Sequence, residues 1–204
     1  MPSCTPAWPA LLAAVLAAPA SAQSAADLAD SLRNQASARG ALPWSARHPV
    51  AWPDFQGRPH LGTSTAAQTS SGVSYMIQCR DSHLAFAVLA AFAPSESWVR
   101  PDIPPSPTAS TPTLRHERTH FNISELFARR LAQSLATSHD LCPHRTKEAR
   151  RIFDQHRSAS DATQSRFDRE TDHGTIGSQE ARWEREVRAG LDSLNTYAIG
   201  EGRD

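Results

Sequence analysis

The sequence predicts an α+β fold, with a small sheet in the first half of the chain and helices in the second half. Two apolar runs, 73–78 and 84–92, flank the polar connection CRDSH, and this pattern is typical of a β-hairpin. Beyond residue 112, long polar stretches carry helix-start and helix-stop signals at their ends. The run over 84–92 is rich in alanine, so a helix there is the alternative to a strand.

Residues 1–22 are predicted to form a secretory signal peptide. The apolar run over 10–18 is too short to span a bilayer, and the small residues Ala20, Ser21 and Ala22 follow it as a cleavage pattern. The basic start of most signal peptides is missing, and an ordinary buried helix is the alternative interpretation. We expect a periplasmic or secreted protein that is not stably inserted in a membrane after cleavage.

The rest of the chain is predicted to be one domain over 43–197, preceded by a flexible lead-in over 23–42 that is rich in alanine and serine and only weakly helical. Apolar residues make up 39% of the 204 residues, which is enough for one modest core. Lys and Arg together number 21, as do Asp and Glu, so the chain lacks the positive field of a typical nucleic-acid-binding protein. We therefore expect no nucleic acid partner.

Two cysteines, Cys79 and Cys142, would remain after cleavage of the signal peptide. In an oxidising compartment they could form a disulfide. The loop that it closes, about 60 residues long, corresponds to a stabilisation of about 3–4 kcal/mol in the chain-entropy model. Two free buried thiols are the alternative.

Three helices are predicted in the second half of the chain. The proline-rich segment 101–112 cannot be regular structure, but Thr111 can cap a helix in which Pro112 takes the first position and which runs to about residue 137. A second helix is predicted over 144–172, and Ser178 is expected to cap a third. The apolar stripe of the third helix steps by four, four and three residues. It consists of Trp183, Val187, Leu191 and Leu194.

The first predicted helix contains His116-Glu117-Arg118-Thr119-His120, an H-E-x-x-H motif. Residues four apart lie one turn above each other on one helix face, so both imidazoles could bind one zinc ion at about 2.0–2.1 Å. Glu117 lies about 100° further round the helix, where its carboxylate could act as the general base towards a zinc-bound water. This short pattern thus supplies two metal ligands and a base.

Chance placement seldom produces this motif. With nine histidines and nine glutamates among 204 residues, random order gives roughly 0.02 matches. The predicted helix also provides the geometry that the motif requires. The alternative is a solvated helix face that carries two histidines without a metal.

A catalytic zinc needs a third protein ligand and one open position. The candidates lie in RFDRETDHG, residues 166–174, where the second predicted helix ends. Glu170 and His173 are three residues apart, so they would share a helix face, and either could be the third ligand. We prefer His173, with Glu170 as the alternate ligand or as a hydrogen-bond partner. An acidic helix end with a favourably placed histidine is the interpretation without a metal.

These segments together resemble a bacterial domain-of-unknown-function family (number 922) of predicted secreted Zn-dependent proteases. LRHERTHFNISELFARRL resembles the family's H-E-x-x-H-F-(D/N)-I helix, and FDRETDHG resembles its later Y-D-x-E-T-x-H-G segment. Gln179 and Trp183 resemble its Q-x-x-W helix, with three residues between them in this chain instead of two, and WPDFQGRP and TSSGVSY resemble two of its upstream stretches. The likeness covers residues 50–194, with Phe167 where the family usually has a tyrosine whose hydroxyl could hold an oxyanion.

The resemblance implies a zincin-like fold, in which a small sheet covers the motif helix and a second helix brings the third ligand. It implies Zn²⁺ as the cofactor. In such folds an edge strand often takes up an extended peptide, and we expect that edge in the hairpin over 73–92.

We carry two functions from different classes. The first is a secreted or periplasmic zinc metallopeptidase that hydrolyses a peptide or protein substrate through a zinc-bound water activated by Glu117. His116, His120 and His173 would be its ligands. The second is a non-catalytic exported zinc-binding or scaffold protein. An open coordination position characterises the first, whereas four protein ligands close a structural site.

Overall fold

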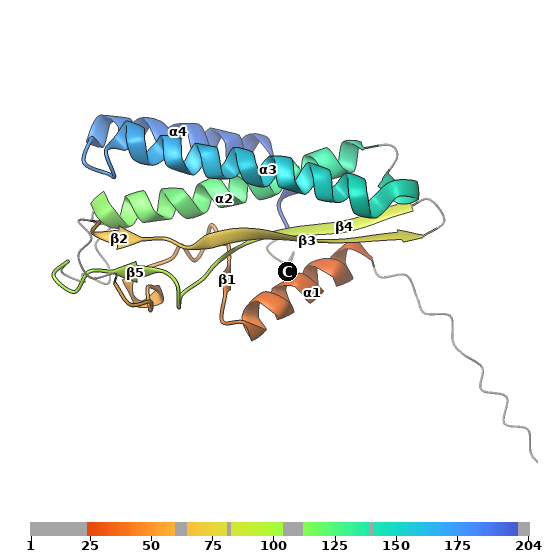
Figure 1. The fold of residues 1–204 in the computed structure, drawn as a ribbon, viewed down its shortest axis with the longest axis horizontal. Helices are drawn as coiled ribbons and strands as arrows, with labels where there is room; N and C mark the ends of the chain where they lie inside the picture. Colours follow the sequence, from red (N-terminus) through yellow and green to blue (C-terminus); the bar gives the residue numbers. More distant parts are fainter. Residues whose placement is uncertain (1–23, 60–64, 81–82, 104–111, 139–140, 200–204) are drawn as a thin grey trace, which may run out of the picture.

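The computed structural model describes residues 24–59, 65–80, 83–103, 112–138 and 141–199. Within these ranges the fold is α+β, as the sequence predicts, with four α-helices and two small sheets. Figure 1 shows the layers: α1 lies on one face of the main sheet, α2 on the other, and α3 and α4 outside α2. The helices and strands are α1 (Ala25–Ala38), β1 (Leu42–Pro43), β2 (Ala67–Gln68), β3 (Ser71–Arg80), β4 (His83–Phe92), β5 (Trp98–Val99), α2 (Pro112–Thr137), α3 (Leu141–Thr171) and α4 (Gly177–Ser193), with short 3-10 helices at Trp52–Asp54 and Asn195–Tyr197.

A long hairpin forms the main sheet. β3 and β4 pair antiparallel, with Val73 opposite Ala90, and β1 pairs with the other edge of β4. The predicted strand over 84–92 is confirmed, and the helix alternative is wrong. β4 is apolar from Leu84 to Phe92 because both of its faces are covered: Leu89 packs in the cluster under α1, and Phe92 packs in the cluster under α2. A second, two-stranded sheet pairs β2 with β5.

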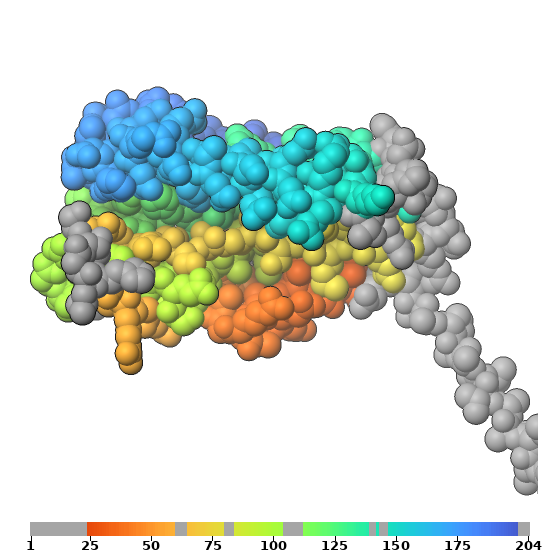
Figure 2. All heavy atoms as spheres, viewed as in Figure 1, coloured from red at the N-terminus to blue at the C-terminus, as the bar shows by residue number. Residues whose placement is uncertain are grey.

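The helix α1 replaces the flexible lead-in predicted over 23–42. Ser24 and Asp27 form a capping box at its start, and its buried face contains Leu28 and Leu32. Figure 2 shows α1 lying against the underside of the strands. The spacing of four between the two leucines is the helical signal that the alanine- and serine-rich composition obscured.

The central helix α2 has the predicted bounds, 112–137. One side of α2, including Phe121 and Leu131, packs against the sheet with Phe92. Another side, including Ile123, packs with Phe167 of α3 and with α4. Because α2 contacts the sheet and both outer helices, its H-E-x-x-H turn is held from several directions.

The outer helices agree with the predictions within a few residues. α3 begins at Leu141, and α4 begins at Gly177 after Ile176 in the N-cap position, so Ser178 lies inside the helix and does not cap it. Figure 1 shows α3 running back along α2, so that the end of α3 lies over the start of α2. This antiparallel arrangement brings the RFDRETDHG segment to the H-E-x-x-H turn.

A disulfide joins Cys79 to Cys142, which is one of the two predicted outcomes. It connects the end of β3 to the start of α3, with the Cα atoms 5.5 Å apart. The predicted signal peptide, 1–22, lies outside the described residues. None of the helices in the described ranges is long and apolar enough to cross a membrane.

Candidate metal centre

The two histidines of the motif lie one turn apart at the start of α2 and point in the same direction. His116 is 5% exposed, and its Nε2 atom lies 3.1 Å from the Nε2 atom of His120. Two nitrogen atoms at this distance, both on one side of the helix, form half of a metal site.

The third group at this point is Asp168 of α3. Its Oδ1 atom lies 2.9 Å from Nε2 of His120 and 3.2 Å from Nε2 of His116. Around a tetrahedral zinc with bonds of about 2.0–2.1 Å, ligand atoms lie about 3.3 Å apart. The donor atoms of His116, His120 and Asp168 are of the right type and spacing to hold one metal ion.

The structure differs here from the predicted third ligand, His173. The His173 side chain is 67% exposed, and its Nδ1 atom lies 3.8 Å from Oδ1 of Asp168, beside the group and not within it. The physical reason is that α3 ends at Thr171, after which Asp172, His173 and Gly174 all have positive φ. A helix-face argument therefore does not apply to His173.

The alternate ligand, Glu170, has other partners. Its Oε2 atom accepts hydrogen bonds from Arg182 and, at 3.0 Å, from Nε1 of Trp183. These bonds connect α3 to α4. Glu170 therefore joins two helices and is not part of the group around the histidines.

Two residues orient the imidazoles from behind. Nδ1 of His116 lies 2.7 Å from Oε1 of the buried Glu180, and Nδ1 of His120 lies 2.7 Å from Oε1 of Gln164. Gln164 also donates from Nε2 to the carbonyl of His120, so its Oε1 must be the acceptor of a proton on His120 Nδ1. That tautomer leaves Nε2 of His120 with a lone pair for a metal.

Sequence reasoning missed Asp168, Gln164 and Glu180. A signal for two of them was present, because Gln164 and Asp168 are four apart in a predicted helix and share one face. Glu180 lies between Gln179 and Trp183 and carried no separate signal.

Phe167 supports the histidine rings from below. It is fully buried, its ring stacks on His116 at 4.6 Å, and it meets His120 and Trp183 edge to face. Phe167 stands where the family usually has tyrosine, and in this chain its ring contacts the two histidine rings and Trp183.

Gly174 allows the turn after α3 to approach His116. A Cβ atom on Gly174 would lie 3.2 Å from Cγ of His116, and the residue has a φ of +88°. Both the close contact and the left-handed backbone favour glycine at this position.

Glu117 lines a cavity of 390 Å³ together with the three donor residues. The residue is 3% exposed, and its Oε2 atom has no hydrogen-bond partner among the described residues. Burial raises the pKa of Glu117, while the nearby charges of His120 and His116 oppose that rise. An unpartnered carboxylate oxygen at a cavity is suited to accept a proton from a bound molecule. The other residues that line this cavity are Thr65, Ala66, Ala67, Gln68, Thr69, Ser71, Thr113, Gln164 and His173.

The histidines and carboxylates are electrostatically coupled. Burial alone would lower the pKa of His116, but hydrogen bonds to Asp168 and Glu180 outweigh it and raise that pKa to about 9. Burial opposes ionisation of Asp168, yet its hydrogen bonds to His116 and His120 hold the pKa of Asp168 well below its usual range. Both shifts favour a protonated His116 beside an ionised Asp168 in the metal-free protein.

Comparison with known proteins gives one match. Searches of the curated proteins and of the solved structures each found no protein similar to this chain. Residues 108–174, which hold the H-E-x-x-H turn, Gln164 and Asp168, match the model of the family described as "Bacterial protein of unknown function (DUF922)", and this match supports the family assignment.

Proposed function

We propose that this chain is an exported zinc metallopeptidase with a zincin-like fold. His116, His120 and Asp168 would hold the ion, and Glu117 would be the general base. The observation that carries the proposal is that the unpartnered Oε2 of Glu117 and the three donor residues line the same cavity. A structural site has no need of a free carboxylate oxygen beside it.

The chain's own groups account for the proton transfers of hydrolysis. Zinc, when bound, supplies a Lewis acid that acidifies water and polarises a carbonyl. Glu117 would take one proton from the attacking water and deliver it to the nitrogen of the leaving amine. The water oxygen would form the new bond to the carbonyl carbon as the C–N bond breaks.

A peptide substrate is favoured by the strand β2 in the cavity wall. β2 pairs with β5 along one edge, and within the described residues its other edge has no partner strand. Ala67 and Gln68 of β2 line the cavity with Glu117. An extended peptide could add to this edge through main-chain hydrogen bonds. The hairpin predicted to offer an edge does so through β3, the edge strand of the main sheet in the described ranges, but Ser71 is the one β3 residue that lines the cavity. We therefore propose β2 as the strand that takes up the peptide.

The second candidate is a non-catalytic zinc-binding protein, which the position of His173 favours. Its ring lies 3.8 Å from Asp168 in a left-handed turn, and a change of side-chain rotamer could bring it to the ion as a fourth ligand. Four protein ligands would close the site and leave no position for a substrate.

Metal content and hydrolysis separate the two functions. We expect one zinc per purified chain, lost in His116→Ala and Asp168→Asn and retained in His173→Ala. Glu117→Gln should keep the zinc and reduce hydrolysis of an unfolded protein substrate by about a thousandfold or more. If His173→Ala loses the zinc, and the unmodified chain with its zinc bound does not hydrolyse the substrate, the non-catalytic function would be established. A chain that binds no zinc after reloading would contradict both.

A further inference from the structure

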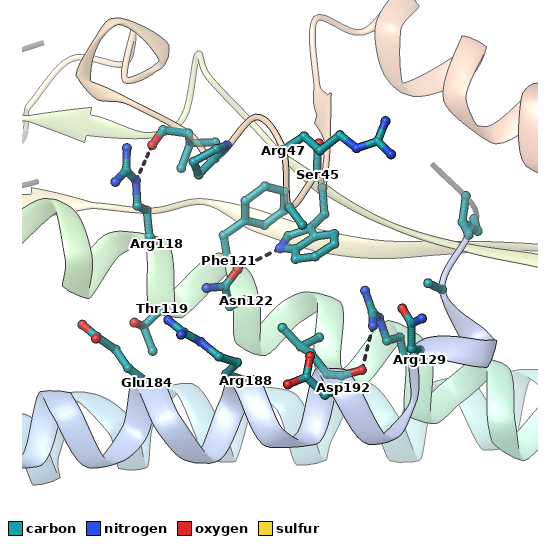
Figure 3. A pocket seen from close by; sticks show the side chains of 18 of the residues that line it. Ser45, Arg47, Arg118, Thr119, Phe121, Asn122, Arg129, Glu184, Arg188 and Asp192 are labelled. Atoms are coloured by element: carbon teal, nitrogen blue, oxygen red, sulfur yellow. Dashed lines mark hydrogen bonds between the residues drawn. The ribbon is translucent and has the colours of Figure 1, made fainter. Parts of the chain in front are cut away.

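A second and larger cavity lies on the other side of α2 from the metal centre. Its volume is 790 Å³, within the range of small-molecule sites, about 300–1,000 Å³. Figure 3 shows it between α2, α4 and the segment before the first 3-10 helix, with side chains entering from all three. Arg118, Thr119 and Asn122 of α2 line it, and none of them lines the metal cavity.

The lining carries a positive excess in a chain whose net charge is zero. Two carboxylates, Glu184 and Asp192, face five arginines. The charge of Arg129 is already balanced, because its Nε atom pairs with Oε1 of the buried Glu125 at 2.8 Å. The five arginines are Arg47, Arg115, Arg118, Arg129 and Arg188.

Three of these arginines have no carboxylate bound to them. In the described ranges, no ion pair is formed by Arg115, Arg118 or Arg188. Asp54 lies near enough to Arg118 for its charge to raise the pKa of the guanidinium, against the larger effect of burial. Nε of Arg118 donates to the carbonyl of Val50 at 2.7 Å, which holds the side chain half-buried. Partial burial of Arg118 without a bound anion is costly, and it lowers the pKa of the guanidinium.

Asn122 adds a neutral donor with a fixed orientation. Its Oδ1 accepts a hydrogen bond from Nε1 of Trp44 at 2.8 Å, so its amide nitrogen points away from Trp44. Figure 3 shows this amide on the same side of α2 as Thr119, towards which Arg188 extends from α4. That nitrogen has no hydrogen-bond partner among the described residues.

We propose that this cavity binds a small organic anion. Its carboxylate or phosphate would be held by Arg118, Arg188 and the amide of Asn122, because guanidinium groups match the paired oxygens of both. Its apolar part would lie on Trp44 and Phe121, which both line the cavity. The site is independent of the metal and of peptide hydrolysis.

The probes are phenylphosphate and phenylacetate, added to the full, chelator-treated chain and followed by isothermal titration calorimetry. We expect one molecule bound per chain, with binding that weakens as salt is raised. The probe that binds more tightly identifies the preferred head group. Because no metal is present, a failure of the proposed peptidase would leave this result unchanged.

Two variants and one control locate the binding. Asn122→Asp keeps an acceptor for Trp44 but replaces the amide donor with a negative charge. We expect this variant to bind the probes at least roughly tenfold more weakly. Arg188→Ala should weaken binding by a similar factor. Arg185→Ala is the control, since Arg185 is exposed on α4 one turn earlier and does not line the cavity. Absence of binding by both probes, or equal binding by all three variants, would overturn the proposal.

Discussion

At the scale of single residues, Gly174 sets the spacing between the turn after α3 and His116. Gly174→Ala is expected to lower the free energy of unfolding by about 1–2 kcal/mol, because alanine is strained at a φ of +88° and its Cβ would press on the imidazole. Metal affinity should fall as well, since the displaced ring belongs to His116, one of the three proposed ligands. Chemical denaturation and metal titration would measure the two effects.

A matched control is available at Gly177, the first residue of α4. A Cβ atom there would meet nothing within 4 Å, so Gly177→Ala should leave stability unchanged or slightly raised. Equal behaviour of the two variants would refute the close contact at Gly174.

The protonation of His116 predicts a pH dependence for the metal-free protein. Its pKa rises from 6.5 to about 9 on folding, so the stability that this group contributes is present below pH 6.5 and is lost as the pH rises through 9. The loss is at most about 1.4 kcal/mol per pH unit for one proton. Zinc must displace this proton, so zinc affinity should rise with pH up to about 9.

Glu180→Gln tests the cause of that dependence. It removes one of the charges that raise the pKa of His116, so the stability loss between pH 6.5 and 9 should become smaller. Urea titrations at pH 6, 7.5 and 9, with zinc binding at each pH, would measure this. An unchanged profile would contradict the role given to Glu180.

The candidate metal centre was predictable from sequence only where its geometry is local. His116, Glu117 and His120 follow from spacing within one helix. Asp168 does not, because its selection over Glu170 and His173 depends on where α3 ends and on how α3 lies against α2. The left-handed turn after Thr171 removed His173 from the helix face that the spacing argument assumed.

At the scale of helices and strands, α1 is the main departure from the sequence-based expectation. Leu32→Ala in α1 is expected to cost about 2–4 kcal/mol, because the side chain is 4% exposed and packs under β4. Asn34→Ala, at an exposed position of the same helix, should change stability by less than about 0.5 kcal/mol. If 25–38 were a flexible lead-in, the two variants would behave alike in thermal denaturation.

The other elements were predictable because their signals are strong and local. The proline at residue 112, the polar connection CRDSH and the four-residue apolar steps in α4 each define an element from its own sequence. The separate β2–β5 pair was not predictable. Its strands are only two residues long, and the two strands that pair are separated by about 30 residues of sequence.

At the scale of the whole molecule, the disulfide connects the sheet to the outer helix layer. The double variant Cys79→Ser with Cys142→Ser should lower the free energy of unfolding by about 3–4 kcal/mol, because the unfolded chain regains the freedom of a long loop. Reduction of the parent protein should reproduce this loss in urea denaturation. Equal stability before and after reduction would show that the bond contributes nothing.

The candidate metal centre draws its parts from three helices, so its two imidazoles should be unequal donors. A carboxylate from α4 backs His116, and an amide from α3 backs His120. The carboxylate pulls more strongly on the Nδ1 proton, so His116 should give the more electron-rich nitrogen to a metal. In a cobalt-substituted sample, nuclear magnetic resonance should then resolve two separate, exchange-protected imidazole N–H signals. Only the His116 signal should shift in Glu180→Gln. Each imidazole N–H signal would therefore report on the helix whose side chain accepts its proton.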